Sequence, residues 1–110
     1  MAAVFKNRNS SRSKVEIAGF YNYSAQWFPC TLNDLSTEGA GLKINHIFVK
    51  GDVIRLKFGF RDDQRVVEAT VANVNGTRIG VAFAVDRLTQ DFLKSVIQAY
   101  QKPTNFRRQS

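Results

Sequence analysis

The sequence has 110 residues, of which 44% are hydrophobic and 23% are charged, as is ordinary for one globular domain with a single core. No apolar run approaches the roughly 18 residues of a membrane span, and the N-terminus lacks the long apolar segment of a secretory signal. The only cysteine, Cys30, excludes an internal disulfide, fits a reducing compartment and is expected to be a buried, inert thiol. The initial methionine favours a free-standing domain.

The net charge of +7 is concentrated at the two ends of the chain. Residues 1–14 and 101–110 hold the whole excess of basic side chains and no acidic ones, whereas residues 15–100 are neutral. A protein that binds duplex nucleic acid usually carries its charge across a folded face. We therefore expect a flexible basic arm over 1–12, a folded body over 13–102 and a basic disordered tail over 103–110. The arm and tail either close over a small anion or are solvated segments without a role.

Six segments of the body have the composition and alternation of β-strands. In chain order they are 14–23, 27–36, 39–44, 52–60, 65–74 and 77–85. The residues that the alternation assigns to the inner face are Val15, Ile17, Tyr21, Tyr23, Phe28, Cys30, Leu32, Ile54, Leu56, Phe58, Phe60, Ile79, Val81, Phe83 and Val85. Pro29 indicates a sheet edge or a bulge, and Asn75-Gly76 predicts a hairpin turn. Six short strands separated by turns predict a small all-β barrel.

The last part of the body changes to helical spacing. Thr89 is the expected N-cap, Asp91 lies in the first turn, and Pro103 marks the end. A single apolar stripe is expected to pack on the barrel, because an isolated helix of this length is marginal in water. The residues of this stripe are Phe92, Leu93, Val96, Ile97 and Tyr100.

Residue patterns typical of catalysis or metal binding are missing from the sequence. His46 is the only histidine, so neither a histidine metal cluster nor a supported Cys–His pair can form, and we expect it to be a loop residue. Asp62 and Asp63 look like a hairpin turn and not like paired general acids. No glycine-rich phosphate loop leads into a helix. The sequence therefore predicts a protein without enzymatic activity, metal or cofactor.

Two polar stretches have residue types that suit a guanine nucleotide with more than one phosphate. Arg8 and Arg12 lie in "FKNRNSSRSK", and arginine forks bind phosphate oxygens or guanine O6 and N7. In "DLSTEGAG", Asp34 and Ser36 lie on one side of an extended chain. The Asp34 carboxylate can accept from guanine N1–H and N2–H, and the Ser36 hydroxyl can donate or accept. Gly39 keeps the surface low for a flat base, although Asp, Ser and Gly together also suit an ordinary turn.

The two stretches together resemble the PilZ domain family. The resemblance rests on RxxxR (Arg8, Arg12) followed about twenty residues later by DxSxxG (Asp34, Ser36, Gly39), with RIGVAF similar to the final strand of the family. It extends over essentially the whole chain. The resemblance implies a six-stranded antiparallel β-barrel with a C-terminal α-helix, and a bacterial, cytoplasmic receptor for cyclic di-GMP.

The resemblance also implies roles for the site residues. Arg8 and Arg12 would hold phosphates and guanine edges from a mobile loop, Asp34 and Ser36 would reach a guanine from the barrel, and Gly39 would shape the floor. Ligand binding would then order the RxxxR loop, and the ordered loop would engage a downstream protein partner. The usual outputs of the family are motility, exopolysaccharide and adhesion.

Two further residues bear on ligand binding. Arg78 lies on the small-residue face of the last expected strand, where a base could approach, and is either a further ligand contact or a solvated side chain. Many family members have an arginine directly before RxxxR, which is associated with binding a stacked ligand pair. Asn7 occupies that position here and favours one ligand per domain.

Two other functions remain open on the sequence alone. The first is a PilZ-like adaptor that binds a protein partner and no nucleotide. The second is a small basic barrel that binds single-stranded nucleic acid by stacking on Tyr21, Tyr23 and Trp27. The neutral body of the chain makes nucleic acid the less favoured partner.

Overall fold

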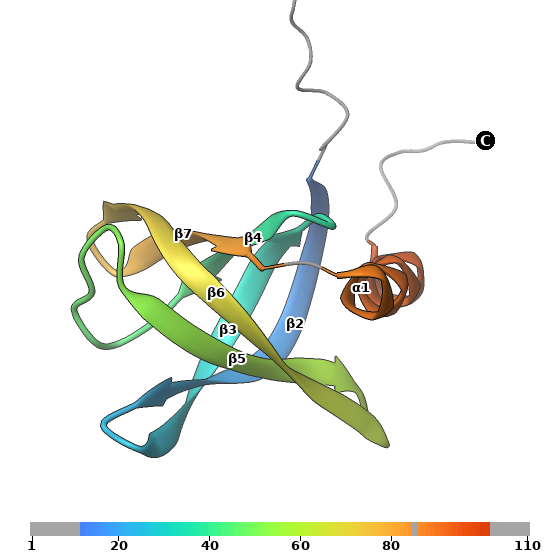
Figure 1. Ribbon diagram of the computed structural model, residues 1–110, viewed down its shortest axis with the longest axis horizontal. Coiled ribbons are helices and arrows are strands. Elements are labelled where there is room, and N and C mark those ends of the chain that lie inside the picture. Colours follow the sequence, from blue (N-terminus) through green and yellow to red (C-terminus); the bar gives the residue numbers. More distant parts are fainter. Residues whose placement is uncertain (1–11, 85, 102–110) are drawn as a thin grey trace, which may run out of the picture.

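The computed structural model describes residues 12–84 and 86–101, and it shows a β-barrel with a helix at one end (Figure 1). The strands are β2 (Ser13–Tyr23), β3 (Gln26–Leu35), β4 (Gly39–Lys43), β5 (Val53–Phe60), β6 (Asp63–Asn75) and β7 (Arg78–Phe83), and the helix is α1 (Arg87–Tyr100). The predicted six-stranded barrel with a terminal helix is confirmed. The expected arm over 1–12 and tail over 103–110 fall almost wholly outside the described residues and stay predictions.

The six strands close into a ring in the order β2-β3-β4-β7-β6-β5, and every neighbouring pair is antiparallel. In this ring the β4/β7 pair lies across the barrel from the β2/β5 pair. Pro29 pairs with Phe20 of β2, but the ladder between β3 and β4 begins only at Thr31. Pro29 therefore lies where β3 has no partner on the β4 side, so the N–H that proline lacks is not needed there, as expected for a sheet edge.

The barrel interior is filled by the alternating apolar residues of all six strands. Of the predicted inward set, Ile17, Leu32 and Phe58 are among the residues buried at 3% exposure or less. Tyr23 follows the same alternation but is 36% exposed, because it lies at the barrel end beside the hairpin turn. Val85 lies outside the described residues. Cys30 is buried and burial raises the pKa of its thiol to about 12, in agreement with an inert thiol.

The hairpin turns follow the sequence only in part. Asn75 and Arg78 form the last pair of the β6–β7 ladder, so Gly76 and Thr77 make the turn, and Gly76 adopts a φ of +65°. The turn between β2 and β3 consists of Ser24 and Ala25, with φ values of +51° and +64°. It contains no glycine or asparagine, the residues from which a turn with positive φ is usually predicted.

The predicted turn at Asp62 and Asp63 is shifted by one residue. Asp63 begins β6, where it pairs with Phe60 across the hairpin and forms an ion pair with Arg65 at 3.2 Å. Arg61 and Asp62 therefore make the turn.

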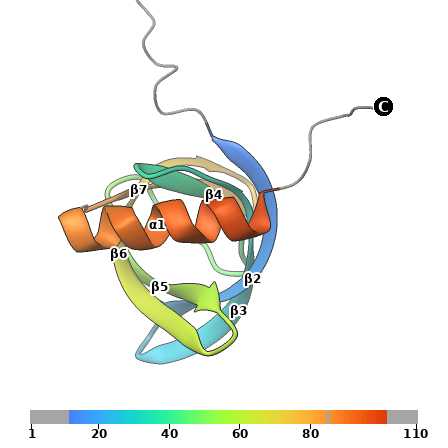
Figure 2. The same cartoon turned by 90° about the vertical axis from the view of Figure 1, so that its right-hand side faces the viewer.

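Helix α1 lies across one end of the barrel (Figure 2). The prediction that Thr89 is the N-cap is wrong: the cap is Asp86, whose Oδ1 accepts the Thr89 N–H at 2.8 Å. This bond favours the carboxylate and lowers the pKa of Asp86. Most of the predicted apolar stripe faces the barrel, with Phe92 packed on Phe58 at a centroid distance of 5.9 Å, but Tyr100 is 37% exposed. The helix within the described residues is not long and apolar enough to cross a lipid bilayer.

The loop after β4 lies at the opposite end of the barrel from α1 (Figure 1). His46 lies in this loop, as predicted, and packs against the rings of Tyr21, Tyr23 and Phe28. Its ring stacks on Tyr23 at a centroid distance of 4.0 Å. The hydroxyl of Tyr21 accepts the Asn45 N–H at 3.2 Å and is also hydrogen-bonded to His46 Nδ1. His46 therefore fixes the loop to the barrel.

Candidate ligand-binding site

Asp34 and Arg12 form an ion pair on the outside of the barrel. The Arg12 Nη1 lies 2.9 Å from the Asp34 Oδ1, and the two side chains are 44% and 33% exposed. Arg12 immediately precedes β2, and Lys14 of β2 is the residue that pairs with Asp34 of β3. The short connection holds the guanidinium beside the carboxylate. Because both groups are partly solvated, the pair is weak and its partners can be exchanged.

A row of four residues crosses four neighbouring strands at the level of Asp34. Asp34 of β3 pairs with Gly41 of β4, Gly41 pairs with Gly80 of β7, and Gly80 pairs with Asn73 of β6. Two glycines thus occupy the middle of the row, and two polar side chains occupy its ends. The row lies on the outer face, since Leu42 and Ile79 beside the glycines point into the core.

Two β-bulges aim the polar ends of this row outward. Leu32 is buried, and strict alternation would also turn Asp34 inward, but the β3 register shifts between these two residues. The same shift occurs in β6 between the buried Val71 and Asn73. In each strand one extra residue reverses the facing of the next, which is how bulges commonly re-aim a side chain beside a functional site.

The glycines make room for these two side chains. A Cβ on Gly41 would lie 2.5 Å from the Asp34 Oδ2, and a Cβ on Gly80 would lie 2.7 Å from the Asn73 Nδ2. Both distances are shorter than real contacts allow. The carboxylate and the carboxamide therefore lie flat over neighbouring glycines, with the carboxylate Oδ1 toward Arg12 and Oδ2 toward β4.

The row forms the floor of a shallow hollow of about 210 Å³, called here the outer hollow. Its lining residues are Arg12, Asn33, Asp34, Gly41, Leu42, Asn73, Asn75, Arg78, Ile79 and Gly80. Two guanidinium groups, one carboxylate and three carboxamides thus face one space. Such a set suits a ligand with anionic groups and an edge of hydrogen-bond donors and acceptors.

Ser36 and Gly39 build the turn beside the outer hollow. Ser36 is 4% exposed, and its Oγ accepts the N–H groups of Glu38 and Gly39, both at 3.1 Å. The Ser36 hydroxyl also donates to the Gly39 carbonyl at 3.3 Å. A Cβ on Gly39 would lie 2.2 Å from the Val81 carbonyl oxygen, so the close approach that this glycine permits is that of the β7 backbone. Neither residue lines the outer hollow.

The structure brings together Arg12, Asp34 and Arg78 of the predicted site residues. Arg78 is exposed and reaches the outer hollow from β7, two residues before Gly80. Arg8 lies outside the described residues.

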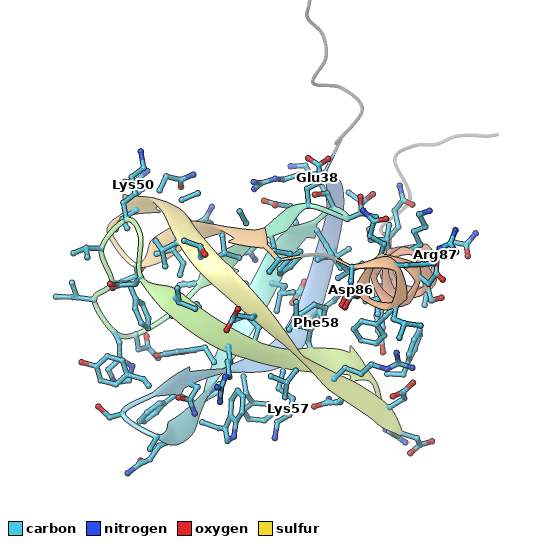
Figure 3. The ribbon with its side chains drawn as sticks, in the orientation of Figure 1. Glu38, Lys50, Lys57, Phe58, Asp86 and Arg87 are labelled. Carbon is cyan, nitrogen blue, oxygen red and sulfur yellow. The ribbon has the colours of Figure 1, made fainter. Side chains whose placement is uncertain are left out.

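Glu38 of the β3–β4 turn and Lys57 lie on opposite sides of the barrel (Figure 3). The Lys57 ammonium lies over the Trp27 ring, 4.7 Å from its centroid.

The aromatic residues considered for nucleic acid do not form one stacking surface. Tyr21 is fully buried in the core, and Tyr23 stacks on His46 at the barrel end. Trp27 faces outward beneath Lys57. Within the described ranges, no group of three metal-ligating side chains lies close enough to hold a metal ion.

The PilZ domain family profile matches residues 6–100 of the sequence. The chain belongs to the PilZ domain family. A search of curated proteins found no match. Solved structures, among them two PilZ domains, share the fold, although their sequences are only 13–17% identical to this one.

Three of these structures show how far the likeness extends. The PilZ domain of CeSA from a cellulose-synthesising bacterium has a TM-score of 0.66 at 17% identity, covering 82% of this chain and 98% of that one. The PilZ domain of Escherichia coli YcgR, solved with c-di-GMP, has a TM-score of 0.70 at 13% identity, covering 86% and 91%. The Bacillus subtilis inhibitor of motility, MotI/DgrA, has a TM-score of 0.67 at 14% identity, covering 86% and 52%.

Sequence reasoning missed the three asparagines that line the outer hollow in this PilZ domain, Asn33, Asn73 and Asn75. Asn73 follows Val67, Ala69 and Val71 at the same alternation, and all three of those residues are buried. Period two alone therefore assigns Asn73 to the core, and the bulge that turns it outward leaves no residue-type signal.

Proposed function

We propose that this PilZ domain is a receptor for cyclic di-GMP. The observation that carries the proposal is the convergence of Arg12, Asp34 and Arg78 on the outer hollow, over a floor of two glycines. PilZ domains are binding or adaptor domains and not enzymes, and the related domain of Escherichia coli YcgR was solved with this ligand. Arginine forks suit its phosphates, and a carboxylate suits the N–H edge of guanine.

In the proposed complex each site residue has a separate role. Arg8 and Arg12 bind phosphates and the O6/N7 edge of a guanine, and Asp34 accepts from its N1–H and N2–H. Arg78 supplies a second cation from β7. Ser36 and Gly39 act beside them by fixing the turn that follows Asp34, through the hydroxyl contacts and the close approach to Val81.

The Arg12–Asp34 ion pair prepares the site for exchange. Arg12 neutralises the carboxylate at 2.9 Å. When guanine donates to Asp34, the guanidinium can turn to a phosphate or to the guanine O6, so the charge of Asp34 remains compensated. The rest of the RxxxR segment then orders over the ligand, and its entropy cost is offset by charge-assisted hydrogen bonds.

We further propose that the ordered segment engages a downstream protein partner in the bacterial cytoplasm, with motility, exopolysaccharide or adhesion as the output. One ligand per domain is expected, because Asn7 replaces the additional arginine. In this mechanism the domain itself carries out no chemical reaction.

The proposal is tested by titrating cyclic di-GMP into the wild-type protein and into Arg8→Ala and Arg12→Ala variants. Each variant is expected to lose specific binding while the far-ultraviolet circular dichroism stays unchanged, since both arginines belong to a polar segment of the sequence. Arg55→Ala, on the exposed outer face of β5, is the matched control and is expected to bind as the wild type does. Partner binding that is equal with and without the nucleotide would instead identify an adaptor with an idle motif.

A further inference from the structure

The carboxamide of Asn73 is a polar group with a defined position and no structural purpose in the described part of the chain. It lies over Gly80, with its Nδ2 and Oδ1 at 2.7 Å and 2.9 Å from the position of a Cβ. It makes no hydrogen bond to any described residue. The side chain is exposed and contributes nothing to the core.

The β6 bulge is what places Asn73 there, and it has a counterpart in β3. The extra residue in β6 is Ala72, and the extra residue in β3 is Asn33. Both bulges lie at the level of the Gly41–Gly80 pair, one on each side of it. Each gives up ladder hydrogen bonds to bring one polar side chain onto the outer face. Asn73 is therefore the structural counterpart of Asp34.

We propose that Asn73 is a specificity-determining residue that binds the N2/N3 edge of the guanine whose Watson–Crick edge donates to Asp34. This inference rests on the proposed function, because it concerns the same ligand at the same site. It adds a residue that belongs to neither RxxxR nor DxSxxG.

The order of side chains across the strands matches the order of atoms around guanine. Arg12 lies on the β2 side, next to the Oδ1 of Asp34, and Asn73 lies beyond the Oδ2 of Asp34 on the β6 side. Around guanine, O6 and N7 come first, N1–H and N2–H follow, and the second N2–H and N3 come last. Arginine suits the first edge and a carboxylate suits the second.

The third edge requires both an acceptor and a donor, and a carboxamide supplies both. The Asn73 Oδ1 accepts the second N2–H, and the Nδ2 donates to N3. Adenine and hypoxanthine both lack the 2-amino group, so neither base can make the first of these bonds. Asn73 therefore adds discrimination at an atom that arginine at O6/N7 cannot read.

The test is a cycle of two proteins and two ligands, measured by calorimetric titration. The proteins are the wild type and Asn73→Ala, and the ligands are cyclic di-GMP and cyclic di-IMP, which lacks the 2-amino group. Asn73→Ala is expected to weaken cyclic di-GMP binding about tenfold, as for loss of a hydrogen-bonded pair. It is expected to weaken cyclic di-IMP binding clearly less, because one of the two bonds is already missing.

Two controls separate this role from others. Asn22→Ala removes the same kind of side chain from β2, which lies across the barrel from β7. Asn22 pairs with Trp27 of β3, and this variant is expected to bind both ligands as the wild type does. Asn73→Ser replaces Asn73→Ala if the latter lowers the melting temperature.

Each outcome has one meaning. Equal weakening of both ligands by Asn73→Ala, or no weakening of either ligand, would overturn the proposal while the receptor function stands. Failure of the wild type to bind cyclic di-GMP would overturn the proposed function itself.

Discussion

The Arg12 guanidinium and the Asp34 carboxylate are in contact at 2.9 Å at the open end of the β2–β3 hairpin. The contact joins Arg12, the last residue of the RxxxR motif, to Asp34, the first residue of DxSxxG. It also leaves the Asp34 Oδ2 directed toward Gly41 and the outer hollow. A partly solvated pair of this kind contributes little to folding, which agrees with the exchange of its partners in the proposed complex.

Removing the Asp34 carboxylate is expected to affect binding and not folding. We predict that Asp34→Ala lowers the affinity for cyclic di-GMP by about ten- to a hundredfold, as for loss of a charge-assisted bond. The free energy of unfolding should change by less than about 1 kcal/mol, since the ion pair is partly exposed. Calorimetric titration and urea unfolding measure the two quantities.

Asp63→Ala is the matched control for this substitution. Asp63 also pairs with an arginine, Arg65, at 3.2 Å, but it lies at the start of β6, outside the outer hollow. Its removal should leave cyclic di-GMP affinity unchanged. An equal loss of affinity in both variants would show that total charge, and not the outer hollow, controls binding.

Alanine at two neighbouring glycines should give opposite results. The Cβ of Gly41→Ala meets the mobile end of Asp34, so the carboxylate is displaced and affinity falls while the fold is retained. The Cβ of Gly39→Ala meets the Val81 backbone carbonyl at 2.2 Å, so β4 and β7 must separate. We predict a loss of about 2 kcal/mol or more of stability for Gly39→Ala. Thermal unfolding and ligand titration of both variants distinguish the two effects, and a stable, binding-competent Gly39→Ala would contradict them.

The hydroxyl of Tyr21 should stabilise the barrel end through the loop after β4. Tyr21→Phe leaves the Asn45 N–H and the His46 Nδ1 without their partner. We predict a loss of about 1–2 kcal/mol in the free energy of unfolding. Tyr23→Phe removes a hydroxyl from a partly exposed ring stacked on His46, and should change the free energy of unfolding by about 0.5 kcal/mol at most. Urea unfolding of the two variants gives the comparison, and equal effects would argue against the Tyr21 contacts.

Cys30 should make the protein less stable in alkali. Burial raises its pKa from 9.0 to about 12 in the folded protein. The folded state therefore retains a proton that the unfolded state loses, and this contribution is complete below pH 9.0 and is lost as the pH rises toward about 12. Cys30→Val lacks the titrating group, so its unfolding free energy should fall less over this interval. Parallel pH dependence of the two proteins would exclude the thiol as a cause.

The sequence specifies the barrel better than it specifies the site. Alternation in β5, with Ile54, Leu56 and Phe58 inward, leads directly to the observed core because that strand is regular over these residues. In β3, continuing the alternation as far as Ser36 predicted that Asp34 and Ser36 lie on the same side of the strand. The strand ends at Leu35 after a bulge, however, and Ser36 turns inward to bond its own loop. Such register shifts depend on pairing with the neighbouring strand, and no residue type in the sequence predicts them.

The helix start shows the same limitation on a smaller scale. Thr89 and Asp86 are both good capping residues, and the sequence cannot tell which one has extended backbone geometry. The structure places Asp86 at φ −118° and ψ −177°, with its carboxylate on the Thr89 N–H. Thr89 is therefore the capped residue, and the helix begins at Arg87.

The most direct test of the account is isothermal titration calorimetry of cyclic di-GMP into the wild-type protein at about 0.15 M salt, where weak surface attraction is screened. GMP and a short single-stranded DNA serve as controls, and equilibrium dialysis serves as a second probe in case the binding enthalpy is near zero. The account predicts saturable binding of cyclic di-GMP alone, with one ligand per domain. No binding by either method, or salt-sensitive binding of the DNA in its place, would contradict it.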